Sequence, residues 1–174
     1  MSQSLSATYL HLIFSTKNRQ RWFTDAALRT ELHSYLGGIS KNLDCPPIIV
    51  GGVDDHVHIL ARMGRCITQS DWVKEIKRVS HTRLKAKDAK MRDFSWQAGY
   101  GIFSVSASSV EVVTEYIRKQ EEHHKKTTFQ EEYRTFLKST ASNGTKNMSG
   151  TESNRIMGHN PVGVGRIYMI RNPG

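Results

Sequence analysis

The 174-residue sequence has little of what builds a covalent framework or a membrane span. Its two cysteines, Cys45 and Cys66, are too far apart for a CxxC motif and too few for a network of disulfides. No stretch approaches the roughly twenty consecutive apolar residues that a membrane-spanning helix needs. The first apolar run precedes the first cations, Lys17 and Arg19, which is the reverse of a signal peptide. These absences predict a cytoplasmic protein with no membrane partner.

Acidic residues are also in deficit. Asp and Glu number 16 against 25 Lys and Arg, which gives a formal net charge of +9 at pH 7 and a sequence pI of about 9.7. A basic excess favours polyanionic partners, because neutralising phosphates releases their counterions. Simple solubility is the alternative, but nucleic acid is the favoured interpretation, ahead of an acidic membrane surface. The sequence has no GxxxxGK[ST] phosphate-binding loop, so we expect no nucleotide cofactor.

Apolar spacing and turn residues divide the chain into short strands and helices up to residue 138. Apolar, β-rich runs predict strands at residues 6–15, 48–50, 56–60 and 94–106. Helical spacing predicts a helix capped by Thr24, with an end or a break at Gly37 and Gly38, and further helices at 70–87, 109–126 and 129–137. The order β-α-β-β-α-β followed by helices predicts a ferredoxin-like α+β sandwich. Its antiparallel sheet would carry two helices on one face, plus C-terminal helices.

Residues 139–174 differ in composition from the rest of the chain. They are rich in Gly, Ser, Thr and Asn and carry no apolar period, apart from one short patch at 162–170. Such a composition is typical of disordered segments and linkers. We therefore predict one globular domain over residues 1–138 and a polar, disordered tail over residues 139–174.

The run HVH is the first candidate for chemistry. On a strand, residues two apart point to the same side, so His56 and His58 would face one metal ion together. An isolated HxH is more often a pair of surface histidines, so this motif alone decides nothing. Asp54 and Asp55 precede it in an expected turn, where we predict that they cap or solvate the backbone.

The run YIRKQ is the second candidate. On a helix, residues four apart lie one above the other, so Tyr116 and Gln120 would present a hydroxyl and a neutral oxygen ligand together. Amphipathic helices also often place a tyrosine at the boundary of their buried face, so this pair is weak by itself. His123 and His124 follow among charged residues, which favours a solvated helix end.

Together these motifs resemble those of the single-tyrosine HUH transposases, which include the IS200-like insertion-sequence enzymes and the REP-associated tyrosine transposases. HVHIL at 56–60, GYGIFSVS at 99–106 and the Tyr-x-x-x-Gln helix occur in the order of the family. YLHLIFSTKNR at 9–19 is similar to the family's first strand and basic loop, and FQEEYRTFL at 129–137 to the start of its C-terminal helix. The resemblance covers roughly residues 7–138, and the tail departs from it.

The resemblance implies a site and a reaction. His56, His58 and Gln120 would hold one divalent cation, Mg²⁺ or Mn²⁺, and Tyr116 would be the nucleophile. The family cleaves and rejoins single-stranded DNA beside imperfect hairpins through a 5′-phosphotyrosine link, which requires no nucleotide cofactor. The resemblance also implies a homodimer, often with the tyrosine helix of one subunit completing the site of its partner.

Two groups of cations are candidates for positioning the DNA backbone. One follows the first strand and the other lies on one face of the helix at 70–87: Lys17, Arg19 and Arg21, and Lys74, Lys77 and Arg78. Each group also suits an ordinary solvated surface. Trp22 borders the first group and is the best candidate for stacking on a base.

Two other functions stay open on the sequence alone. One is a catalytically silent, ferredoxin-like nucleic-acid-binding protein, such as a domesticated transposase. The intact histidine, tyrosine and glutamine set opposes that function, and the altered tail favours it. The other is a metal phosphohydrolase in which the same histidines activate water and Tyr116 is only structural. It would turn over without a covalent protein–DNA adduct.

Overall fold

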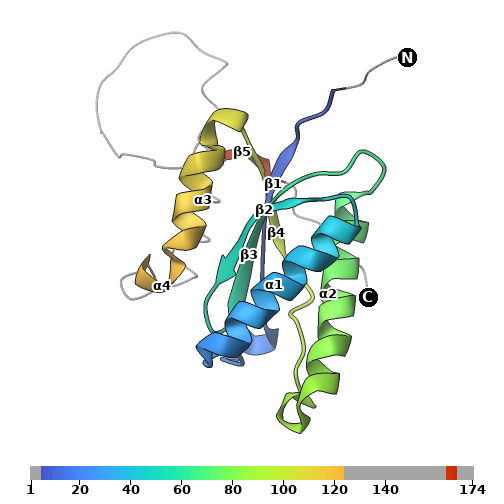
Figure 1. Cartoon of the computed structure of the whole chain (residues 1–174), viewed down its shortest axis with the longest axis vertical. Helices are drawn as coiled ribbons and strands as arrows, with labels where there is room; N and C mark the ends of the chain where they lie inside the picture. Colours follow the sequence, from blue (N-terminus) through green and yellow to red (C-terminus); the bar gives the residue numbers. More distant parts are fainter. Residues whose placement is uncertain (1–4, 124–163, 168–174) are drawn as a thin grey trace.

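A central antiparallel sheet forms the middle layer of the fold (Figure 1). The computed structural model describes residues 5–123 and the backbone of residues 164–167. In spatial order the strands are β2 (Pro47–Gly52), β3 (His56–Arg62), β1 (Tyr9–Ser15), β4 (Gly101–Val105) and β5 (Val164–Ile167). The first four strands have the arrangement of a ferredoxin-like sheet with β1 and β3 at its centre, so the predicted fold class is confirmed.

Helices cover both faces of this sheet. α1 (Ala26–Asn42) and α2 (Gln69–Lys87) lie side by side on one face, and α3 (Val110–Arg118) lies on the other (Figure 1). The short helix α4 (Gln120–His123) follows α3, and 3₁₀ turns occupy Lys17–Arg19, Ala89–Met91 and Ala107–Ser109. Within the described part of the chain, no helix combines the length and the apolar character needed to cross a membrane.

Strand alternation sorts the side chains between the two faces. On β1, Leu12 and Phe14 pack into the larger core with α1 and α2, whereas Ile13 packs into a smaller cluster with Val113 and Ile117 of α3. Burial of each such side chain contributes roughly 1.5–3 kcal/mol. The sheet is therefore covered by apolar contacts on both sides, and the smaller cluster sets the position of α3.

The boundaries of α1 differ from the predicted ones because a side-chain cap decides them. Asp25 rather than Thr24 caps the helix, since its carboxylate accepts a hydrogen bond from the backbone N–H of Ala27. The helix also continues through Gly37 and Gly38 without a break, because the residues after them extend its buried face.

The second half of the chain differs more. The strand predicted at 94–106 is reduced to β4, preceded by a single bridge between Trp96 and Thr16. The helix predicted at 109–126 is divided at Lys119, which caps α3, and α4 begins one residue later. The helix predicted at 129–137 lies outside the described residues. Of the predicted tail, the described residues 164–167 form β5 against β4.

Gly51 allows α3 to approach the sheet closely. It pairs with His58 across the β2–β3 ladder. A Cβ atom at Gly51 would lie 2.7 Å from Cγ2 and 3.0 Å from the carbonyl oxygen of Ile117. Any larger residue would push the C-terminal end of α3 away from β2. The glycine therefore sets the separation between the sheet and the helix that carries Tyr116.

We expect Gly51→Ala to lower the free energy of unfolding by about 1–3 kcal/mol, because overpacking forces the backbone to shift. Gly38→Ala is the matched control, since a Cβ at Gly38 meets no atom within 4 Å and lies inside α1. It should stabilise the protein by about 0.5–1 kcal/mol through helix propensity. Chemical denaturation measures both effects. A Gly51→Ala variant as stable as the parent would contradict the close packing of α3 on β2.

Candidate active site

Two histidines of β3 lie on the α3 side of the sheet. His56 and His58 have 0% exposed surface, and their ring centroids are 5.1 Å apart. Gln120, the first residue of α4, is 1% exposed, and its side chain lies next to His56. Among the described residues, no group of three or more His, Cys, Asp and Glu side chains is arranged to hold a metal. A cation at this place would therefore need the Gln120 amide in addition to the two imidazoles.

Asp55 orients His56. Its carboxylate lies 2.7 Å from Nδ1 of His56 and accepts two hydrogen bonds from Arg19, at 2.9 and 2.7 Å. Burial alone would raise the pKa of the Asp55 carboxyl, but the bonds from His56 and Arg19 hold that pKa below its ordinary value. An ionised carboxylate favours the tautomer with the proton on Nδ1, so that Nε2 is the atom His56 would present to a cation.

His58 has a different partner. Its Nδ1 lies 2.9 Å from Nε2 of His11 on β1, and the two rings are stacked with centroids 5.2 Å apart. His11 is itself fully buried, and this burial lowers its pKa to about 3. His58 therefore hydrogen-bonds to a neutral imidazole, whereas His56 hydrogen-bonds to a carboxylate.

Tyr116 lies beside this histidine pair. Its ring centroid is 6.0 Å from that of His58 and 6.3 Å from that of His11, in edge-to-face geometry. The tyrosine is carried by α3, whose buried residues Val113 and Ile117 pack on the sheet. The spacing of Tyr116 and Gln120 thus brings both residues to the histidines, although the helix is divided between them.

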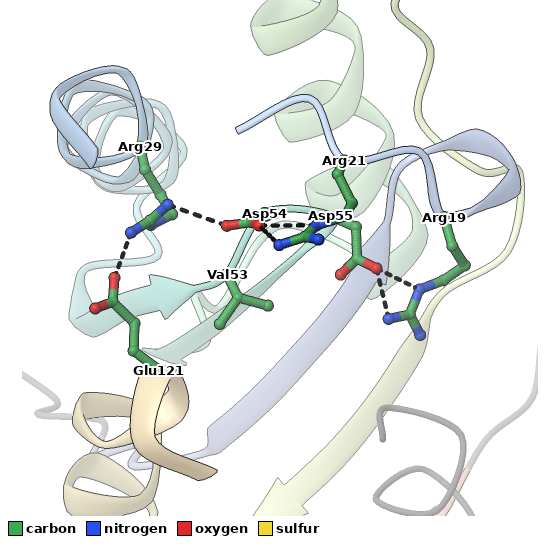
Figure 2. Close-up of a pocket in the computed structure, with 7 residues that line it drawn as sticks. All are labelled: Arg19, Arg21, Arg29, Val53, Asp54, Asp55 and Glu121. Carbon is green, nitrogen blue, oxygen red and sulfur yellow. Dashed lines mark hydrogen bonds and ion pairs between the residues drawn. The ribbon is translucent and has the colours of Figure 1, made fainter. Parts of the chain in front are cut away.

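A network of ion pairs lines an open pocket of about 350 Å³ at the start of β3 (Figure 2). Asp54 pairs with Arg21 and with Arg29, and Arg29 also pairs with Glu121 of α4. Asp55 pairs with Arg19 and with His56. The two aspartates thus lie in the turn where they were predicted, and they also bind side chains. Because each arginine in this pocket faces a carboxylate, the pocket is balanced in charge.

The six predicted DNA-binding cations do not lie together. Arg19 and Arg21 line the pocket at the start of β3, where Arg19 pairs with Asp55, the partner of His56. In contrast, α2 covers the opposite face of the sheet from α3 (Figure 1). On α2, Lys74 is exposed and Arg78 pairs with Glu75. Lys77 contacts the segment before β4. Lys17 lines a second surface pocket next to the 95–98 segment.

Lys77 holds the chain that leads into β4. Its Nζ donates hydrogen bonds to the carbonyl oxygens of Gln97 and Gly99, at 2.9 and 2.8 Å. The ammonium also lies 5.1 Å from the centroid of the Phe14 ring and 5.5 Å from that of Tyr100. The ammonium therefore bonds to the backbone that leads into β4.

Sequence reasoning missed His11, Asp55 as a partner of His56, and Arg29. Strand alternation on β1 would place His11 on one of the two faces, but only the register with β3, in which Ile13 faces His58, places it beside the site. Arg29 lies on α1, and its ion pairs join segments far apart in sequence. No local pattern marks either contact.

Comparisons with known proteins identify a family and a fold. The family model for IS200-like transposases matches residues 4–120. A proposed transposase from Deinococcus radiodurans R1 is 23% identical, with a TM-score of 0.53 over 69% of this chain and 96% of that one. A REP-associated tyrosine transposase bound to a REP hairpin is 13% identical, with a TM-score of 0.53 over 71% of this chain and 74% of that one. No match was found among curated proteins.

The two solved structures are too distant in sequence to show more than a shared fold. The family match is different in kind, because it spans more than half of the chain and contains the HVH strand, Tyr116 and Gln120. The chain belongs to the family of IS200-like transposases.

Proposed function

We propose that the chain cleaves and rejoins single-stranded DNA by a metal-dependent transesterification in which Tyr116 is the nucleophile. The observation that carries the proposal is the position of the Tyr116 ring, 6.0 Å from the ring of buried His58 and on the same face of the sheet as His56. Membership of a transposase family supports DNA cleavage as the reaction class.

The chain's own residues fit a divalent cation. The candidate ligands are buried and offer neutral nitrogen or oxygen atoms: His56 and His58 from β3, and Gln120 from α4. Asp55 orients His56. When bound, Mg²⁺ or Mn²⁺ would polarise the scissile phosphate and offset the charge that develops on its oxygens. Imidazole ligands suit Mn²⁺ better than Mg²⁺.

Tyr116 would form the covalent link. Its Oη attacks the phosphorus, the new Oη–P bond forms, and the P–O3′ bond breaks. The phenol loses its proton and the 3′ oxygen gains one, which leaves a 5′-phosphotyrosine and a free 3′-hydroxyl. A free tyrosine has a pKa of about 10, so the hydroxyl needs a base or a positive field to react near neutral pH. The phosphotyrosine keeps the energy of the phosphodiester, so rejoining requires no nucleotide cofactor.

The DNA partner we propose is a single strand with a hairpin next to the cleavage position, acted on by a homodimer. The REP hairpin bound by the solved REP-associated relative supports this class of partner. Arg19 and Arg21 are the best-placed cations for its backbone, because they line the pocket at the start of β3, where His56 is the first residue. Each would have to exchange a carboxylate for a phosphate.

We expect Tyr116→Phe to abolish the covalent protein–DNA band on a denaturing gel while binding of the same single-stranded DNA changes by less than about threefold. The phenylalanine keeps the ring that packs against His58 but has no nucleophilic oxygen. Removal of the divalent cation from the parent protein by a chelator should also abolish the band, and so should His58→Ala. The DNA would be labelled strands that carry candidate element ends.

The other functions give different results in this assay. Cleavage without a covalent band would favour a phosphohydrolase in which Tyr116 is structural. Binding of the correct ends without cleavage or a covalent band would favour a catalytically silent binding protein. Cleavage and covalent linkage that survive in Tyr116→Phe would show that Tyr116 is not the nucleophile.

We expect Asp55→Asn to weaken Mn²⁺ binding by about 10–100-fold, because the carboxylate that orients His56 is lost. Asp54→Asn is the matched control, since Asp54 is the neighbouring carboxylate and it pairs with Arg21 and Arg29. Isothermal titration with Mn²⁺ measures both. Equal losses in the two variants would point to a general effect of charge at this end of β3.

We expect Arg21→Ala to weaken binding of single-stranded DNA several-fold and to lower the dependence of log K on log salt by about one unit. Arg78→Ala is the control, because both arginines are exposed and paired with a carboxylate. Arg78 differs in lying on α2, which covers the face of the sheet opposite α3. Fluorescence anisotropy at several salt concentrations separates them. A stronger effect of Arg78→Ala would place the DNA on the α2 face.

A further inference from the structure

His11 makes a contact that the proposed reaction does not use directly. It lies on β1, two residues before Ile13, which faces His58 in the antiparallel ladder. This diagonal places Nε2 of His11 2.9 Å from Nδ1 of His58, with the rings inclined at 26°. Both side chains have 0% exposed surface. The hydrogen bond is therefore shielded from competition by water.

The two nitrogens in this contact must share one proton. A neutral imidazole carries a proton on one nitrogen and a lone pair on the other. If Nδ1 of His58 holds the shared proton, Nε2 of His58 has the lone pair that a cation requires. If Nε2 of His11 holds it, His58 carries its own proton on Nε2 and is unable to bind a cation there. The direction of one hydrogen bond thus decides whether His58 is a competent ligand.

We propose that His11 is a positioning residue that accepts the Nδ1 proton of His58 and so directs the Nε2 lone pair of His58 toward the cation. The inference rests on the proposed function, because it assigns a role in the same metal site. His11 acts through His58 and touches neither the cation nor the DNA.

A neutral partner suits this position. His56 already has an ionised carboxylate partner, Asp55, whose charge is balanced by Arg19. A second carboxylate in place of His11 would be buried between Phe103 and Tyr116 and would place a negative charge next to the incoming phosphate. An imidazole supplies the acceptor without that charge. The two ligand histidines are thus oriented by partners of different chemistry.

The proton can be located directly. Long-range ¹H–¹⁵N NMR of the metal-free protein distinguishes the two tautomers of each ring. We expect His58 to carry its proton on Nδ1 in the parent protein, and in His11→Phe to shift toward the Nε2-protonated form. A proton found on Nε2 of His11 in the parent protein would overturn the proposal, whatever the variants do.

Metal affinity supplies the second readout. His11→Phe keeps a ring of similar size without an acceptor and should weaken Mn²⁺ binding about 10–100-fold, as expected for loss of an outer-shell partner. His11→Gln offers an amide oxygen to Nδ1 of His58 and should recover most of that loss. His33→Phe, a partly buried histidine on α1, is the matched control and should bind Mn²⁺ as the parent does. Thermal unfolding confirms that each variant is folded.

The outcomes separate the two proposals. Unchanged Mn²⁺ affinity in His11→Phe, with His58 still protonated on Nδ1, would overturn the role of His11 and leave the proposed function intact. If the parent protein binds no Mn²⁺, the proposed function fails, and the tautomer of His58 in the metal-free protein still decides whether His11 orients it. Equal weakening in His11→Phe and His11→Gln would also count against the hydrogen bond as the cause.

Discussion

The antiparallel pairing of β1 with β3 is the constraint on which the site depends. With Ile13 opposite His58, the two strands place His11, His56 and His58 on the α3 face of the sheet. A slip of one residue would turn these histidines into the larger core, because neighbouring residues on a strand point to opposite faces. Leu12 of β1 packs into that core and opposes such a slip. The same register therefore serves stability and the arrangement of the site.

Burial of so many polar groups is tolerated because they meet one another. A buried imidazole or carboxylate without a hydrogen-bond partner costs several kcal/mol, so pairing is a condition for folding. Asp55 joins His56 to Arg19, and His11 joins His58 to β1. The charges at the start of β3 are balanced by this network, although the whole chain carries a formal charge of +9. The charge of this part of the surface thus differs from the net charge of the chain.

The helix that carries Tyr116 is held differently from the rest of the fold. α1 and α2 share the large core, whereas α3 rests on a smaller cluster that includes Ile13, Val113 and Ile117. The absence of a side chain at Gly51 lets this cluster close. An element with fewer buried contacts opens more readily than the core does. Tyr116, the proposed nucleophile, therefore lies on the less strongly anchored layer, and the histidines lie on the sheet itself.

The sequence by itself determined the order of elements, the common face of His56 and His58, and the spacing of Tyr116 and Gln120, because strand and helix periods are properties of the local backbone. It did not determine the division of the helix at Lys119 or the bond from the Lys77 ammonium to the segment before β4, which depend on caps and neighbours. Only the tertiary structure brought His11 to His58, 47 residues away, and set α2 on the face opposite α3. Contacts of that kind depend on strand register and on packing between layers, which no local period encodes.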